Sequence, residues 1–101
     1  MNLPTHRPPI HPSEILQAEF MQPYHLTPQM LAQATGIPIQ EINDILEYQK
    51  PITAETALRL SYVFGTSAEL WLNGQIQWDI WHILHSEKSS ELKMLQPIHL
   101  S

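Results

Sequence analysis

The amide side chains of Gln40 and Asn43 lie three positions apart, which places both on one face of a helix. Such amides pair with adenine edges in the major groove of DNA, and Ile39 on the same face suits a thymine methyl group. Asp44 also lies on this face, and its carboxylate would repel the phosphates of a duplex. These residues could therefore recognise base edges in DNA, while the carboxylate of Asp44 would weaken binding.

Phosphate contacts near this face would come from few groups. A helix N-terminus beginning near Thr27 can hold one phosphate, and Lys50 could hold another. Glu41 and Glu47 either form an ordinary solvated helix face or weaken DNA binding. We predict a DNA-binding set of Thr27, Gln29, Ile39, Gln40, Asn43 and Lys50.

The other polar spacings predict no catalytic or metal site. Asp79, His82 and His85 stand at i, i+3 and i+6, a spacing that could hold a metal, but chance histidines on a surface helix explain it better. Glu14 and Glu19 would lie about 140° apart around a helix and do not form a catalytic dyad. No nucleophile–base pair or phosphate loop is recognisable. We therefore expect no enzyme activity, no cofactor and no metal.

Composition places the chain among small, acidic, cysteine-free proteins. Its 101 residues suffice for one domain, and without Cys neither disulfides nor thiolate metal sites can form. The formal net charge of −5 is opposite to that expected of a duplex-binding domain and suits a basic protein partner. We see no membrane-spanning apolar run and no secretory leader, so we expect a cytoplasmic protein.

Pro, Gly, Ser and Thr stand where helices would begin and end, and their positions predict an all-α fold of five helices. Residues 1–12 contain four prolines and would form an extended arm, residues 13–85 the helical domain, and residues 86–101 a polar tail. We expect helices over 13–22, 28–36, 38–47, 54–64 and 68–85. The apolar residues expected to face the core are Ile15, Leu16, Phe20, Ile42, Ile45, Leu46, Leu58, Leu60, Val63 and Phe64.

Residues 27–46, "TPQMLAQATGIPIQEINDIL", have the spacing of a helix-turn-helix. Ala32 is small enough for two helices to cross closely, and Gly36 can adopt the left-handed conformation that turns the chain. Apolar residues occupy the four inner positions, Leu31, Ile37, Ile42 and Ile45. Such a unit presents the first half of its second helix to a major groove, which is where the amides lie.

The last predicted helix is too apolar for one buried face. One stripe consists of Trp71, Gly74, Trp78 and Trp81, and a second, nearly opposite, of Leu72, Ile76, Ile80 and Ile83. We assign the tryptophan stripe to a dimer or partner interface, where Gly74 would let another backbone approach closely. In the alternative, the tail folds back and closes the core through Leu92, Leu95 and Ile98.

Four longer strings carry a family resemblance: "HPSEILQAEF" at 11–20, "TPQMLAQATGIP" at 27–38, "ITAETALRLSYVFGTSAELWLN" at 52–73 and "WDIW" at 78–81. Together they resemble the HigA (virulence-associated protein I, VapI) antitoxins, which are lambda-repressor-like helix-turn-helix proteins of the Xre type. The resemblance spans residues 8–85 and implies a five-helix fold with a long C-terminal helix, and a homodimer. It also implies a HigB-like ribonuclease toxin as partner, and repression of the operon through double-stranded operator DNA.

The chain departs from the family's pattern in three places. Thr27-Pro28 stands where members commonly have Ser-Gln, Gly74 replaces a common Leu, and "EYQK" at 47–50 replaces a turn of the Asn-Gly-Lys-Arg type. The missing cations bear on DNA affinity rather than on the fold. The alternative function is therefore an interaction module that neutralises a partner protein without sequence-specific DNA binding.

Overall fold

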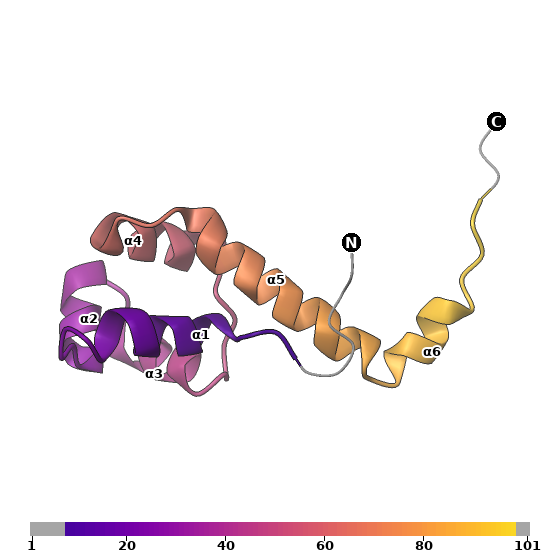
Figure 1. Cartoon of the computed structure of the whole chain (residues 1–101), viewed down its shortest axis with the longest axis horizontal. Coiled ribbons are helices and arrows are strands. Elements are labelled where there is room, and N and C mark those ends of the chain that lie inside the picture. The colour runs from indigo at the N-terminus through magenta and orange to yellow at the C-terminus, as the bar shows by residue number, and fades with distance from the viewer. Residues whose placement is uncertain (1–7, 99–101) are drawn as a thin grey trace.

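The computed structural model describes residues 8–98, and all regular structure in that range is helical (Figure 1). The elements are α1 (Pro12–Ile15), the π-helix η1 (Leu16–Met21), α2 (Pro28–Thr35), α3 (Ile39–Leu46), α4 (Ala54–Phe64), α5 (Ala68–Leu84) and α6 (Lys88–Lys93). In Figure 1, α1 to α4 gather at one end, while α5 extends away from them and leads to α6. The all-α prediction is confirmed, with an additional helix inside the predicted tail.

Side-chain caps begin three helices where the sequence predicts them. The hydroxyls of Thr27, Thr53 and Ser67 each accept a hydrogen bond from the backbone N–H three residues later. Gly36 and Gly65 end α2 and α4 in the left-handed conformation, with φ of 74° and 72°. In the short turn between α4 and α5, Gly65 ends the first helix and Ser67 caps the second.

The first helix differs from its predicted form. It begins at Pro12 and widens into the π-helix η1, where Gln22 N–H donates to the Gln17 carbonyl. His11 and Pro12 are buried, although the predicted arm includes both. His11 caps the helix by accepting a hydrogen bond from Ser13 N–H, a role that the usual cap preferences do not assign to histidine.

The core lies among α1, η1, the α2–α3 pair and α4, and the first turns of α5 close it. Its buried side chains include the four inner positions of the predicted helix-turn-helix, Leu31, Ile37, Ile42 and Ile45. Leu16, Leu60 and Trp71 are buried with them, and Phe20 packs against the cluster. The predicted helix-turn-helix wedge is therefore confirmed.

Helix α4 packs through small residues rather than through all the large ones predicted. Ala57 and Ser61 face the core together with Leu60, whereas Leu58 and Val63 are 49% and 38% exposed. The prediction that Leu58 and Val63 feed the core is wrong. Small side chains four residues apart let neighbouring helices approach closely, so hydrophobicity alone misidentified the buried face.

Helix α5 projects beyond the core, which makes the molecule longer than a compact chain of its size. The radius of gyration is 16.6 Å, whereas a compact domain of this length has about 13 Å. The tail does not fold back, because Leu92, Leu95 and Ile98 are 44%, 70% and 80% exposed. Closure of the core by the tail is therefore wrong. Within residues 8–98, none of the helices is long and apolar enough to cross a lipid bilayer.

Candidate DNA-binding surface

The turn between α2 and α3 is held by hydrogen bonds from its own residues. Gly36 N–H donates to the Ala32 carbonyl at 2.9 Å and closes α2. The Thr35 hydroxyl donates to the Leu31 carbonyl at 2.7 Å and accepts from Ile37 N–H at 3.1 Å. The backbone of the turn is therefore satisfied before α3 begins, which fixes the direction of α3 relative to α2.

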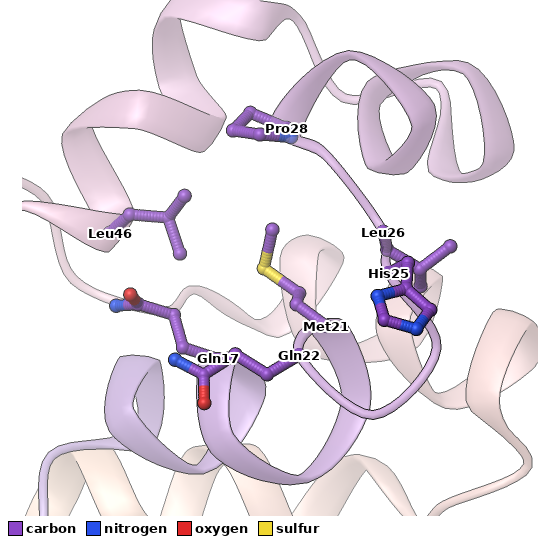
Figure 2. Close-up of a pocket in the computed structure, with 7 residues that line it drawn as sticks. All are labelled: Gln17, Met21, Gln22, His25, Leu26, Pro28 and Leu46. Atoms are coloured by element: carbon purple, nitrogen blue, oxygen red, sulfur yellow. The ribbon is translucent and has the colours of Figure 1, made fainter.

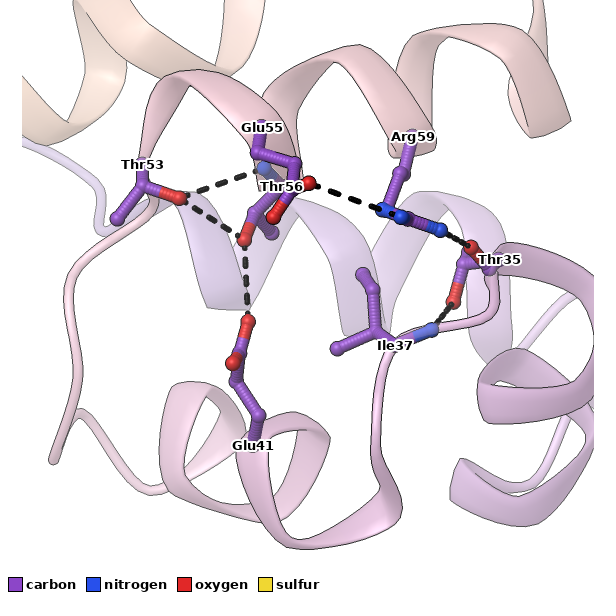
Figure 3. A network of polar contacts seen from close by, with 7 residues as sticks. All are labelled: Thr35, Ile37, Glu41, Thr53, Glu55, Thr56 and Arg59. Atoms are coloured by element: carbon purple, nitrogen blue, oxygen red, sulfur yellow. Dashed lines mark hydrogen bonds and ion pairs between the residues drawn. The ribbon is translucent and has the colours of Figure 1, made fainter.

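A second set of contacts ties this turn to α4 (Figure 3). Arg59 Nη1 donates to the Thr35 carbonyl at 2.8 Å, and Arg59 Nη2 lies 3.7 Å from Glu55 Oε1. A Cβ atom on Gly36 would lie only 2.8 Å from the same guanidinium. Arg59 is therefore engaged in holding the turn, although its side chain lies near the predicted DNA-binding unit.

The outer face of α3 carries the residues predicted to read bases. Ile39 and Gln40 are exposed and Asn43 is partly exposed, and by helical position Gln40 lies almost opposite the buried Ile42. Gln40 Nε2 donates to Asp44 Oδ1 at 3.1 Å. Asp44 therefore holds the Gln40 amide in one orientation on this face, while occupying one of its donors.

Glu41 does not share this outer face. Its Oε2 accepts a hydrogen bond from the Thr56 hydroxyl at 3.2 Å, so the carboxylate turns toward the first turn of α4 (Figure 3). A negative charge at a helix N-terminus is favoured by the helix dipole. Of the three acids expected to repel DNA, Asp44 and Glu47 remain on accessible surface, and the expected repulsion is correspondingly smaller.

The other predicted contacts, Thr27, Gln29 and Lys50, are all exposed. Thr27 and Gln29 lie at the start of α2, and Lys50 follows α3 in a loop whose backbone N–H groups donate to the Asp44 carbonyl. Lys50 is the sole Lys or Arg in the sequence between residues 8 and 58. The six predicted residues thus lie on α2, on α3 or in the loop after it, and none of them is buried.

Sequence reasoning missed an aromatic cluster behind the end of α3. Tyr48 has a φ of 63°, a left-handed conformation that costs about 1–2 kcal/mol for a residue with a side chain. Its ring stacks on that of His11 with centroids 4.1 Å apart, and its hydroxyl donates to Glu14 Oε1 at 2.5 Å. The sequence holds one indication of this role. The chain must turn after Leu46 and has no glycine there, so another residue must take the left-handed position.

Burial shifts the pKa of both rings in this cluster. Desolvation lowers the pKa of His11 from its ordinary value, while the charges of Glu14 and Asp79 act in the opposite direction and His82 lowers it further. Burial raises the pKa of Tyr48, and its hydrogen bond to Glu14 adds to that increase. Both rings are therefore neutral at physiological pH in the folded chain.

An open groove of 540 Å³ borders the start of α2 and the end of α3 (Figure 2). The residues lining it are Gln17, Met21, Gln22, His25, Leu26, Pro28 and Leu46. Amides, a thioether, aliphatic groups and one imidazole make up this lining. Such a set suits contact with another macromolecule better than bond-making chemistry, which needs paired nucleophilic or acid–base groups.

On α5, most of the tryptophan stripe packs within the chain. Trp71 is fully buried, and Trp78 packs edge-on against His11 with ring centroids 4.8 Å apart. A Cβ atom on Gly74 would lie 3.4 Å from Pro12 Cγ, so Gly74 accommodates this chain's own residue rather than a partner's backbone. The assignment of Trp71 to a dimer or partner interface is therefore wrong, and Gly74 and Trp78, both partly exposed, contact this chain's own N-terminal segment. Trp81 is partly exposed beside them.

The exposed apolar stripe of α5 is the opposite one. Ile76, Ile80 and Ile83 are 52%, 44% and 43% exposed, and we call these three residues the isoleucine stripe. Leu72, which shares their spacing, packs against the core instead. The prediction of two apolar faces is thus confirmed, and the tryptophan face is the one that this chain's own N-terminal segment covers.

No model of a known protein family matches the chain. Among characterised relatives, it is 45% identical over 73 residues to virulence-associated protein I of Dichelobacter nodosus, covering 72% of this chain and 68% of the relative. It is 30% identical over 97 residues to antitoxin HigA-1 of Vibrio cholerae, covering 96% and 90%. The structure of Pseudomonas aeruginosa antitoxin HigA with the higBA promoter matches with a TM-score of 0.81 at 33% identity, covering 90% and 99%.

The similarity is not confined to the helix-turn-helix. The match to the Vibrio cholerae antitoxin covers nearly the whole chain, and the structural match to the Pseudomonas aeruginosa antitoxin covers nine tenths of it. Fold, sequence and the α2–α3 geometry therefore agree. The chain belongs to the HigA (virulence-associated protein I) family of helix-turn-helix antitoxins.

Proposed function

We propose that this antitoxin binds the operator of its own operon through the outer face of α3 and represses transcription. The observation that carries the proposal is the accessible set Ile39, Gln40 and Asn43 on a helix whose direction is fixed by Gly36 and Thr35. The Pseudomonas aeruginosa relative was solved with promoter DNA, which supports duplex DNA as the ligand class. The role is regulatory, and it places the protein in the cytoplasm with its operator.

The antitoxin acts as a homodimer paired through the isoleucine stripe of α5. Ile76, Ile80 and Ile83 are exposed on a helix that projects from the core, and neighbouring exposed apolar side chains of this kind favour an interface. A two-fold axis brings the same patch of each copy together. Two recognition helices then face one duplex at a fixed separation, as repressors with two half-sites require.

The toxin partner is a small basic ribonuclease of the HigB kind. The antitoxin's net charge of −5 favours encounter with a basic protein. The groove beside α2, lined mainly by apolar and amide groups, offers one surface on which such a partner can seat. The antitoxin would inhibit the toxin by covering part of its surface, without catalysing a reaction itself.

Duplex DNA from immediately upstream of the gene tests the DNA-binding proposal against its alternative. Mobility shifts of this duplex and of a scrambled duplex of equal length are compared at one salt concentration, because salt changes both affinities. Tighter binding to the upstream duplex supports operator recognition. Equal, weak binding, together with retained neutralisation of a co-expressed toxin, would identify the chain as an interaction module alone.

A further inference from the structure

Tyr48 adopts a backbone conformation that its own side chain disfavours. Its φ of 63° lies in the left-handed region, directly after the C-cap of α3. Residues persist in such conformations when the surroundings over-determine them, and such sites often serve function. Here the ring is stacked on His11 at an interplanar angle of 10° and the hydroxyl is bound to Glu14. The loop after α3 is therefore tied to α1 through one side chain.

His11 joins three elements of the fold. It is only 2% exposed, it caps α1, its ring stacks on Tyr48, and Trp78 of α5 packs edge-on against it. The ring of Tyr48 also packs edge-on against Trp78, with centroids 5.6 Å apart. The cluster of His11, Tyr48 and Trp78 thus connects the end of α3 to the helix that bears the isoleucine stripe.

The distances between the His11 ring and Ser13 show whether the imidazole is neutral or charged. Its Nδ1 lies 3.0 Å from Ser13 N and 2.8 Å from Ser13 Oγ. Because a backbone N–H can only donate, Nδ1 must carry a lone pair, and the imidazole in this arrangement is neutral with its proton on Nε2. A proton on Nδ1 would remove the cap of α1.

We propose that His11, Tyr48 and Trp78 form a positioning cluster that fixes the recognition helix α3 and the Lys50 loop relative to α5. This inference rests on the proposed function. Since the isoleucine stripe pairs α5 in the dimer, the cluster sets the separation of the two recognition helices and so the half-site spacing that the dimer accepts. Tyr48 acts through α3 and Lys50 rather than by contacting bases.

The cluster also makes operator binding sensitive to acid. The groups that face His11 are Glu14 from α1, Tyr48 from the loop, and Asp79 and His82 from α5. Glu14 and Asp79 would attract a protonated imidazole, but protonation still removes the Nδ1 acceptor that caps α1. The ring then loses the position on which Tyr48 stacks, and α3 loses its fixed orientation.

Three substitutions separate the contributions of ring, hydroxyl and charge. Tyr48→Gly keeps the left-handed turn without strain but removes the ring, Tyr48→Phe keeps the ring without the hydroxyl, and His11→Asn keeps a capping acceptor that does not titrate. Tyr24→Gly is the matched control, because Tyr24 is a loop tyrosine that is 68% exposed. Melting temperature and light scattering confirm that each variant is folded and dimeric.

Fluorescence anisotropy measures affinity for the upstream duplex and for duplexes whose half-site separation is changed by one base pair. We expect Tyr48→Gly to weaken operator binding about tenfold, roughly the effect of removing one hydrogen-bonded base edge, and to flatten the preference for spacing. Tyr48→Phe should recover most of this affinity. As the pH falls from neutral through the lowered pKa of His11, the wild type should lose operator affinity relative to His11→Asn.

Wild-type affinity and spacing preference in Tyr48→Gly would overturn the inference, as would a constant ratio of wild-type to His11→Asn affinity across pH. Either result leaves the proposed function intact if the wild type still prefers the operator. A wild type that binds operator and scrambled duplexes equally overturns both.

Discussion

The α2–α3 unit and helix α5 both carry apolar residues at helical spacing, but they differ in whether one chain can bury them. In the α2–α3 unit a single apolar wedge, which includes Leu31 and Ile42, is fully covered by the rest of the fold. Helix α5 has two apolar faces, and the N-terminal segment covers only the tryptophan side. When a helix has one apolar face, its sequence predicts that this face packs in the core. When a helix has two, the sequence of the helix alone does not say which face other segments cover.

The largest expected effect lies on the face that this chain leaves uncovered. In a two-fold dimer, Ile80→Lys places two cations in one apolar interface, and we expect the dimer dissociation constant to rise at least about 100-fold, or 2.7 kcal/mol. Light scattering at micromolar concentration should then report a monomer. Leu58→Lys is the control, because Leu58 is 49% exposed on α4, away from the isoleucine stripe. If Ile80→Lys remains a dimer, as the control should, the dimer interface lies elsewhere.

The next largest effect concerns the turn of the α2–α3 unit. Gly36→Ala meets both a positive φ and the guanidinium of Arg59 at 2.8 Å, so we expect a decrease of about 2 kcal/mol in unfolding free energy. Gly65→Ala is the matched control, since it has nearly the same φ and no atom within 4 Å of the added Cβ, and should lose about 1 kcal/mol. Urea unfolding measures both. Equal decreases would show that Arg59 adapts without consequence.

A smaller effect is expected at the acid on the recognition face. Asp44→Asn removes one negative charge per subunit yet keeps an oxygen that can accept from Gln40 Nε2. Affinity for operator and scrambled duplexes should rise by a similar factor, about three- to tenfold at low salt, because phosphate repulsion is independent of sequence. Anisotropy titrations on both duplexes measure this. A gain confined to the operator would show that Asp44 affects base reading rather than repulsion.

The smallest effect is on stability at acid pH. The folded chain holds His11 at a lowered pKa, so the unfolded chain binds the proton more readily, and the stabilisation is present above the unfolded pKa of about 6.5. It is lost as the pH falls from there through the folded pKa. Thermal unfolding from neutral to acid pH should therefore show the wild type losing more stability than His11→Asn. Parallel curves would show that the pKa of His11 is the same in the folded and unfolded chains.

Most of the α2–α3 unit could be predicted because its signals are local. Thr27 caps a helix, Gly36 turns it, and the four inner positions follow the helical period, so each expectation depends on neighbours within one or two turns. The exposure of Gln40 and the partial exposure of Asn43 follow from the same period. The family resemblance added the partner class, which no spacing could supply.

The features that could not be predicted depend on contacts between distant segments. The tryptophan face of α5 was assigned to a partner, but Pro12 and His11, some sixty residues earlier, contact it within the chain. Glu41 turns away from the recognition face because Thr56 offers it a donor across the turn. Tyr48 takes a left-handed position that its type disfavours because His11 and Glu14 hold its side chain. No local pattern reports any of these pairings.

The most direct test of the central claim, that α3 reads operator DNA, is the binding of Gln40→Ala to operator and scrambled duplexes. Gln33→Ala is the matched control, an exposed amide on α2 outside the predicted set. At fixed salt, we expect Gln40→Ala to weaken operator binding by roughly 1–3 kcal/mol for each base edge that the amide no longer binds, while scrambled-duplex binding and the control stay near wild type. Equal affinities of wild type and Gln40→Ala for the operator would contradict the claim.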